Sequence, residues 1–456
     1  YLFSKQDLKL IRQQTSKKHQ LSLALHLCVL RYPRRVWQID EKLPDYLIDL
    51  VARQLLLSPD LLDGSQHEPH LRREQLRQLR QQFGFHLFND TTKQGLTNWI
   101  LPAALSTDKA IVLVDSLLSR MRHEQIVIPT FPVLEDFLYH IIQDANQQTF
   151  DALTQNLTDQ QQQALDVLLA NRDESQQSYA TWLRQPSGKT NVKNFLELLN
   201  RLIFLKKMNL GVFDDYGVNA NRLSQLARRC ERLSATRLRN LAKPSERYAL
   251  LVALALELQS SLIDQILNMF TQLYHSIFKR AQTIYSEQFF ADGKTINQHL
   301  HQYVKLGQLL IATRQSQQDV YQSIDDTFSW DTLVKDIEQA EILTRPKNFD
   351  FLTLVGNRYS YIRRFSPHLL QAFTFKGDEE NAGLRQAIQL ICEVDTGERK
   401  DLPEWTPTDF VDDRWKPYIF QDGELQRRYY ELCVLDKLRD GLRSGDIWVE
   451  GSEQYR

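Results

Sequence analysis

The chain has 456 residues, of which 42% are hydrophobic, 10% aromatic and 25% charged, and its 56 basic and 57 acidic residues give a net charge of −1. This is the composition of a folded globular protein, and it excludes a disordered chain. The length suggests about three domains. The low content of glycine (16) and proline (14) predicts a mainly α-helical fold.

The four cysteines, at positions 28, 230, 392 and 433, lie far apart in the sequence. This spacing argues against a zinc site or a disulfide framework and suits a reducing cytosol. The longest apolar run, Tyr248 to Leu258, is about half as long as a membrane span and contains Glu257. The chain begins at Tyr1 rather than methionine, so we expect a segment of a longer protein.

Residues 1–90 are predicted to form a compact module of short helices, one of which ends before Pro33. The last of these helices carries Arg73, Arg77 and Arg80 on one face. The first 80 residues hold 14 basic and nine acidic side chains, a net charge of +5. Three short helices with arginines on the third are compatible with a DNA-binding module, and also with arginines that are simply solvated.

Residues 91–188 are predicted to form a second helical module. Ile126 to Pro129 indicates a short extended piece. Thr158 and Gln161 have the spacing of a capping box, in which each side chain bonds to the backbone N–H of the other residue.

The most basic stretch runs from Arg184 to Arg247, with 14 basic and five acidic residues and a net charge of +9. Within it, residues 189–246 are predicted to form a basic helical module, with one helix from Arg222 to Arg232 and another capped by Ser234. This order is compatible with a variant of the helix-turn-helix motif. Such a field in a nearly neutral chain points to a polyanionic partner, although the same charges also fit a solvated helical surface.

Residues 247–345 are predicted to form a long-helix dimerisation region. The helical pattern continues from Ser245 to about Phe290, and Gly293-Lys294-Thr295 is expected to interrupt it. A heptad-like seam could pair with the same helix of a second subunit, or pack inside its own chain. The seam consists of Ile263, Ile266, Phe270, Leu273 and Ile277.

Residues 346–456 are predicted to form an acidic α+β linker segment. Residues 378–456 carry 11 basic and 19 acidic side chains, a net charge of −8. Pro417 to Gly423 predicts a strand and turn, Arg427 to Leu442 a helix, and Ile447 to Glu450 a strand.

Several common catalytic motifs are missing from the sequence: there is no His-Glu-x-x-His, no Gly-x-Ser-x-Gly, no pair of neighbouring cysteines and no dinucleotide-binding loop. These patterns therefore indicate no metal-binding residue in this segment. Composition and pattern leave two functions open. One is a DNA-binding protein of several helical modules, and the other is a non-enzymatic helical scaffold whose basic surface binds an acidic protein partner.

The C-terminal residues carry a more specific signal. Arg428-Tyr429-Tyr430-Glu431-Leu432, followed by Leu442 to Ser452, closely resembles a hallmark of the Tn-three (class II replicative) transposase family. Earlier blocks resemble the same family in the same order along nearly the whole chain. These blocks are Leu30 to Arg34, Arg72-Arg73 with Phe83 to Phe85, Trp99 to Ala104, Trp182 to Pro186, Gly356 to Tyr359 and Arg363 to Pro367.

The resemblance implies a large bacterial transposase that binds the terminal inverted repeats of its element and joins them to target DNA. In that family the N-terminal half binds transposon ends. A later RNase-H-like domain holds an Asp-Asp-Glu triad with two divalent metal ions, usually magnesium. We expect that domain outside this segment, so we assign no catalytic residue to the segment and expect no cofactor within it. The implied partners are double-stranded DNA and a second copy of the chain, without a membrane, in the bacterial cytoplasm at the nucleoid.

The cations of the first module and of the basic stretch are the candidate DNA contacts. Most are expected to grip phosphates, and a few at helix N-termini to read guanine edges. The candidates are Arg31, Arg34, Arg35, Arg72, Arg73, Arg77, Arg184, Lys189, Lys193, Arg222, Arg228, Arg229, Arg232, Arg237 and Arg239.

Overall fold

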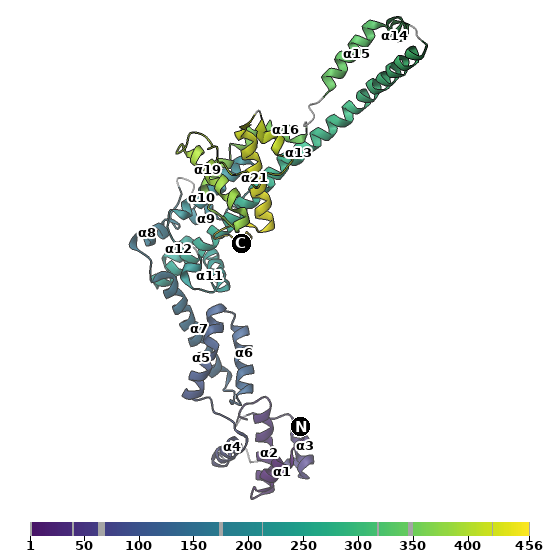
Figure 1. The fold of residues 1–456 in the computed structure, drawn as a ribbon. Coiled ribbons are helices and arrows are strands. Elements are labelled where there is room, and N and C mark those ends of the chain that lie inside the picture. The colour runs from purple at the N-terminus through teal and green to yellow at the C-terminus, as the bar shows by residue number, and fades with distance from the viewer. Residues whose placement is uncertain are drawn as a thin grey trace. The chain divides into compact units, whose positions relative to one another are not determined.

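The computed structural model describes residues 2–38, 41–62, 69–172, 177–211, 213–316, 319–344, 350–421 and 423–455. The chain divides into two compact units. Unit 1 comprises Tyr1–Leu165 and Asp214–Leu254, and unit 2 comprises Asp166–Phe213 and Ala255–Arg456. Helices predominate in both units (Figure 1), which confirms the predicted mainly α fold. The assignment of separate functions to five successive modules stays a prediction.

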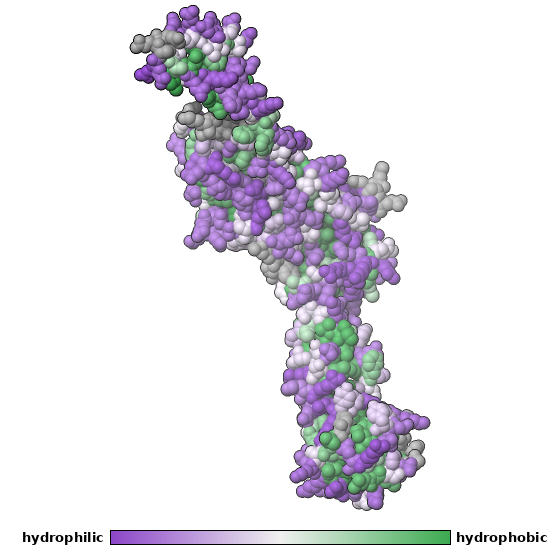
Figure 2. Space-filling view, turned by 90° about the vertical axis from the view of Figure 1, so that its right-hand side faces the viewer, coloured by the Kyte–Doolittle hydropathy of each residue, from purple (hydrophilic) through white to green (hydrophobic). Residues whose placement is uncertain are grey.

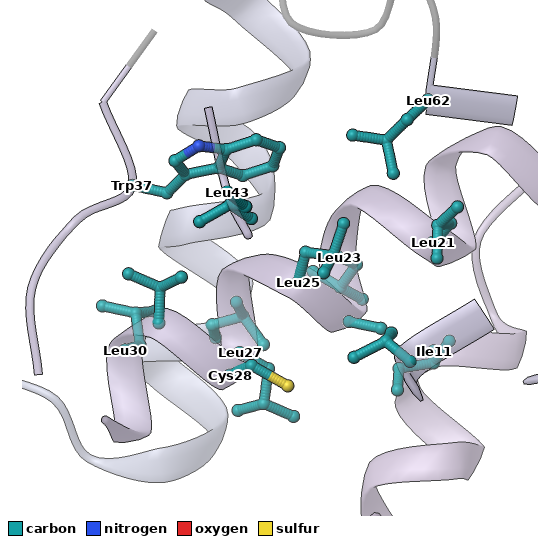
Figure 3. Packing of buried hydrophobic residues seen from close by; sticks show 14 of the residues in the cluster. Ile11, Leu21, Leu23, Leu25, Leu27, Cys28, Leu30, Trp37, Leu43 and Leu62 are labelled. Carbon is teal, nitrogen blue, oxygen red and sulfur yellow. The ribbon is translucent and has the colours of Figure 1, made fainter. Parts of the chain in front are cut away.

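Unit 1 begins with four helices around a first hydrophobic core. They are α1 (Lys5–Arg12), α2 (Lys17–Arg31), α3 (Asp45–Leu55) and α4 (Pro69–Phe83), with the 3₁₀ helix η1 (Pro59–Leu62). Helix α2 is the centre of this core, because every residue from Leu21 to Leu30 is buried. Figure 3 shows the labelled side chains of the cluster, from Ile11 of α1 to Leu62 of η1, gathered around α2.

A second core of unit 1 lies among three longer helices, α5 (Asp90–Ser106), α6 (Ala110–His123) and α7 (Phe131–Thr154). Ile100, Leu117 and Leu138 are among its buried residues. The predicted extended piece at Ile126–Pro129 is confirmed, since Ile126 pairs with His86 and Ile128 with Arg35. Helices α11 (Ala220–Arg232) and α12 (Ala235–Arg239) complete the unit, together with the first residues of α13 (Pro244–Ser316).

Local capping signals in the sequence are matched by the structure. Gln161 donates its backbone N–H to the Thr158 hydroxyl at 3.3 Å, and Thr158 donates its own N–H to the Gln161 side chain at 3.0 Å. Ser234 accepts the N–H of Arg237 at the start of α12. These bonds join residues three apart in the chain, so sequence spacing alone was enough to predict them.

Helix α13 is continuous from Pro244 to Ser316, so the predicted interruption at Gly293-Lys294-Thr295 is wrong. One glycine inside a helix costs only about 1 kcal/mol relative to alanine, which a long helix tolerates. By length and composition α13 is apolar enough to cross a membrane, but 67% of its most apolar window is buried inside the structure. Burial of that kind is what a core helix shows.

Unit 2 contains α13 from Ala255 onward together with a series of short helices. Before α13 come α9 (Tyr179–Leu183) and α10 (Val192–Lys206), while α8 (Asp159–Val167) lies at the boundary between the units. After α13 follow α14 (Val320–Phe328), α15 (Trp330–Leu343), α16 (Phe351–Gly356), α17 (Tyr359–Ile362), α18 (Ser366–Ala372), α19 (Ala382–Thr396), α20 (Lys416–Ile419) and α21 (Arg427–Ser444).

Two small antiparallel sheets lie in the C-terminal part of unit 2. Strand β1 (Phe375–Gly377) pairs with β4 (Ile447–Val449), which confirms the predicted last strand, and β2 (Phe420–Gln421) pairs with β3 (Glu424–Leu425). The predicted strand from Pro417 is instead the short helix α20 followed by β2. Proline is favourable in the first turn of a helix, where its missing N–H would have no partner in any case.

Candidate nucleic-acid interface

Most of the predicted arginines of the first module are engaged inside the protein. Arg31 donates two hydrogen bonds to the carboxylate of Asp7, both at 2.7 Å, and its guanidinium lies 4.9 Å from the centre of the Phe83 ring. The Asp7 side chain is 1% exposed. Burial tends to raise the pKa of Asp7, but hydrogen bonds from Arg31 and Ser4 bring it below its ordinary value. Arg31 is therefore held at neutral pH in an ion pair whose carboxylate is buried and whose guanidinium is partly exposed.

The other arginines around this core have similar partners. Arg35 forms a two-point ion pair with Glu41, and Arg72 donates to the backbone oxygen of Trp37. Arg77 pairs with Glu74 at 2.7 Å on the surface of α4. These contacts neutralise or occupy the side chains, so we expect a smaller contribution to DNA binding than the sequence suggested.

The two remaining arginines of the first-module candidates are Arg34 and Arg73. Arg34 has a left-handed backbone with φ of 73°, and its guanidinium lies 5.4 Å from the centre of the Phe85 ring. Arg73 is exposed on α4 and has no partner among the residues that the structure describes. Of the helix-face arginines, Arg73 is thus the one best placed to meet a ligand.

The basic stretch is divided between the two units. Arg184, Lys189 and Lys193 belong to unit 2, whereas the arginines of α11 and α12 belong to unit 1. Arg184 donates its Nε–H to the backbone oxygen of Ala180 at 3.0 Å, and Lys189 and Lys193 are exposed at the start of α10. The net charge of +9 is therefore not the charge of one compact body.

Arg222 is buried, and its assignment as a DNA contact is wrong for the structure described. The residue is 1% exposed and lies 3.2 Å from a carboxylate oxygen of Asp108, with further hydrogen bonds to Gln225 and Asn146. Burial lowers the pKa of the Arg222 guanidinium, while the Asp108 carboxylate opposes this effect. The side chain ties α11 to the α5–α7 helices, and it is not available to a phosphate.

A helical pattern in the sequence could have identified this position. Arg222, Leu226 and Cys230 recur every four residues, and the last two are buried at 1% exposure. Residues at i, i+4 and i+8 share one helix face, so Arg222 belongs to the apolar face of α11.

The opposite face of α11 and the adjoining α12 present arginines to solvent. Arg228 and Arg232 are one helical turn apart, and Arg237 follows on α12; all three are exposed and have no partner among the described residues. Arg239 is exposed as well, whereas Arg229 is paired with Glu246. We call Arg228, Arg232, Arg237 and Arg239 the α11–α12 basic surface.

The predicted dimerisation seam lies in the core of unit 2. Ile263, Ile266, Phe270, Leu273 and Ile277 are between 0% and 8% exposed. The Phe270 ring lies 5.9 Å from the ring of Tyr274, whose hydroxyl donates to the backbone oxygen of Leu432 in α21. The heptad-like spacing thus reflects packing within the chain, and these five side chains cannot face a second subunit without leaving the core.

Three of the sequence blocks that resemble the transposase family meet around one buried ionic cluster. Arg363 donates two hydrogen bonds to Asp395, both at 2.7 Å, and lies 3.2 Å from Glu431. Arg427 bridges the same two carboxylates, at 2.9 Å from Asp395 and 2.6 Å from Glu431. Tyr359 donates its hydroxyl to Glu431 at 2.7 Å. Burial, then the Glu431 carboxylate, raises the pKa of Tyr359.

We call Tyr359, Arg363, Asp395, Arg427 and Glu431 the α17–α19–α21 cluster. A side chain at Gly356 would have its Cβ 2.8 Å from the Tyr429 hydroxyl, so the glycine allows this close approach. The two arginines of the cluster balance its two carboxylates, so the cluster links helices α17, α19 and α21 and has no charge left for a ligand. Sequence reasoning noted these blocks one by one but did not predict that they meet.

No group of three or more histidine, cysteine, aspartate or glutamate side chains is placed to hold a metal ion within the described part of the chain. The surface is largely hydrophilic on the face drawn in Figure 2, with scattered hydrophobic patches. Ile111, Phe131 and Tyr139 are among the exposed hydrophobic side chains of α6 and α7.

Comparison with known proteins relates the chain to one group of enzymes. Residues 1–141 match the family described as Domain of unknown function (DUF4158). The "Transposase for transposon Tn3926" of Escherichia coli is 33% identical over 100% of this chain and 46% of its own length. The transposases for transposon Tn21 of Escherichia coli and Tn501 of Pseudomonas aeruginosa are each 32% identical, with the same coverage. The chain therefore spans about half the length of the curated relatives it matches.

Proposed function

From the homology of this chain, along its whole length, to transposases of the Tn-three family, we propose that it is the DNA-binding and assembly portion of a DNA transposase. This homology is the observation that carries the proposal. The proposed ligand is the terminal inverted repeat of the transposon. The intact protein would act as a homodimer in replicative transposition, on the nucleoid in the bacterial cytoplasm.

The strand-transfer chemistry is assigned to another part of the intact protein. The family resemblance suggests an RNase-H-like domain with an Asp-Asp-Glu triad, in which two magnesium ions would activate the attacking hydroxyl and stabilise the leaving oxygen. The residues described here are proposed to bind and align the ends. Because the predicted seam is buried, the proposed dimer contact must use other residues.

The α11–α12 basic surface supports the DNA-binding part of the proposal. Its arginines are exposed on two adjoining helices of one unit, and Arg228, Arg232 and Arg237 have no acidic partner among the described residues. Arginines of this kind can grip phosphates and release the counterions condensed on DNA. Outside the two basic regions of the chain acidic residues predominate, as in α15, so the positive field is local.

We expect the chain to bind inverted-repeat duplex with a strong dependence on salt. If about six to eight phosphates are neutralised, the logarithm of affinity should fall with the logarithm of salt concentration at a slope of roughly −5 to −7. Fluorescence anisotropy with the element's own terminal repeat, beside a scrambled duplex of equal composition, measures both slope and preference. A slope near zero without preference for the repeat would instead favour a scaffold that binds an acidic protein.

Replacing Arg228 and Arg232 together by alanine should weaken binding and reduce the steepness of the salt slope by about 2, since two phosphate contacts are lost. The matched control replaces both residues by lysine, which keeps the point charges and should retain most of the slope. Circular dichroism checks that α11 remains folded. If the alanine variant binds with the affinity and salt slope of the unmodified chain, these arginines lie outside the DNA interface.

A further inference from the structure

Helix α1 carries three cations on one face. Lys5, Lys9 and Arg12 stand at i, i+4 and i+7, so their side chains leave the helix within about 60° of one another. All three are exposed. None of them was among the candidate DNA contacts, because the sequence signal of the module came from its more numerous arginines.

These cations have no ion-pair partner among the residues that the structure describes. The arginines of the same module mostly do, since Arg31 is held by Asp7 and Arg35 by Glu41. The surplus positive charge of the first 80 residues is therefore presented to solvent by side chains such as those of α1, and not by the pairs around the core.

The inward face of α1 holds the helix firmly on the module. Ser4 and Asp7 form a capping box, with Ser4 donating its N–H to Asp7 at 2.8 Å and Asp7 donating its N–H to the Ser4 hydroxyl at 3.2 Å. Asp7 is also bound by Arg31, and Ile11 is fully buried in the first core, as Figure 3 shows. Because Asp7 and Ile11 point inward, the folded module already holds the cationic face of α1 toward solvent.

The cations border a shallow open hollow with a volume of about 530 Å³, which is lined by Lys5, Leu8, Lys9, Arg12 and Gln13. No lining residue is acidic. Along the helix axis Lys5 and Arg12 are about 10 Å apart, because each residue rises 1.5 Å. One DNA strand advances by about 3.4 Å per phosphate along the duplex axis, so the cationic face of α1 has the length of a contact with a few successive phosphates.

We propose that α1 is the element of the N-terminal module that binds the DNA backbone, through Lys5, Lys9 and Arg12. This inference rests on the proposed DNA-binding function and assigns the contact to a surface outside the predicted arginines. The contacts go to phosphates, so they strengthen binding to any duplex and orient the module on it, while base recognition lies with other residues.

The test compares the whole chain with a variant that carries Lys5→Gln, Lys9→Gln and Arg12→Gln. Loss of three phosphate contacts should make the salt slope less steep by about 2.7. The ratio of the DNA affinity of the unmodified chain to that of the variant should then fall about forty-fold between 50 and 200 mM salt. The fall should be equal on terminal-repeat and scrambled duplex. Circular dichroism confirms that both proteins are folded.

The control variant is Lys42→Gln with Arg53→Gln, two exposed cations of the same module. Arg53 shares α3 with Asp45 and Asp49 at four-residue spacing, so that face has no surplus positive charge. The salt slope of this control variant should equal that of the unmodified chain. If the unmodified chain binds but the α1 variant keeps its slope, the α1 proposal fails alone. If the unmodified chain shows no salt-dependent binding, the proposed function itself fails.

Discussion

Replacing Glu431 by glutamine is expected to lower the free energy of unfolding of unit 2 by about 3 kcal/mol, because removing one partner of a buried ionic cluster leaves the others uncompensated. Glu431 is 3% exposed and receives hydrogen bonds from Tyr359, Arg363 and Arg427. In the variant two arginines would share the single carboxylate of Asp395. Removing one partner of a buried ion pair costs about 3–5 kcal/mol. We expect the lower value because Arg363 and Arg427 are 28% and 38% exposed, so water screens their charges.

The loss of stability should be measured within unit 2, because two compact units need not unfold in one transition. Native-state hydrogen exchange followed by mass spectrometry reports on peptides from α19 and α21, where a loss of 3 kcal/mol corresponds to exchange roughly 100-fold faster. Glu450→Gln is the matched control. It removes a carboxylate that is 59% exposed from a surface pair with Lys376, so a change of about 0–1 kcal/mol is expected. Equal effects of the two substitutions would contradict the structural role of the cluster.

Lowering the pH from 7 to 4 is expected to destabilise the N-terminal module by about 3 kcal/mol through His26 alone. Burial, followed by the nearby positive charge of Arg72, lowers the pKa of His26 from 6.5 to about 4. Between pH 6.5 and pH 4, His26 therefore binds a proton in the unfolded chain but stays neutral in the folded chain. The stability from neutral His26 is fully present above pH 6.5, begins to fall below it, and is lost as the pH passes through about 4.

His26→Leu should remove this dependence, since leucine suits the surrounding apolar core and does not titrate. The ring of His26 lies 5.1 Å from that of Trp37, so the fluorine resonance of a fluorotryptophan at Trp37 reports unfolding of this module during urea titrations. The comparison is made at pH 7.0 and 4.0. The control His123→Leu removes an exposed histidine of α6 and should leave the pH dependence of the Trp37 resonance unchanged. If His26→Leu loses as much stability on acidification as the unmodified chain, His26 is not the responsible group.

Local features were predictable because their determinants are close in sequence. The Thr158–Gln161 capping box and the Ser234 cap of α12 each depend on residues within one helical turn. The break expected at Gly293 failed for the opposite reason. One glycine is a weak local signal, and the rest of a long helix outweighs it.

The candidate site was less predictable because the sequence around a charged residue does not show which distant residue will pair with it. Arg31 is bound by Asp7, which is 24 residues away, and Arg222 by Asp108 and Asn146, which are 114 and 76 residues away. The heptad-like seam through Ile266 and Phe270 is a similar case. Its spacing predicts an apolar face, but the sequence does not specify whether the same chain or a second chain covers that face.

The sequence by itself determined the mainly helical fold, the caps at helix ends and the surplus of positive charge in two regions, and ordered blocks such as Arg428 to Leu432 carry its resemblance to the transposase family. Tertiary structure alone decided which cations remain available, since ion pairing and burial depend on residues far apart in the chain. It directs Lys5, Lys9 and Arg12 outward and buries Arg222. The physical reason is that helix formation is governed by neighbours, whereas the electrostatic state of a side chain is governed by whatever the fold packs against it.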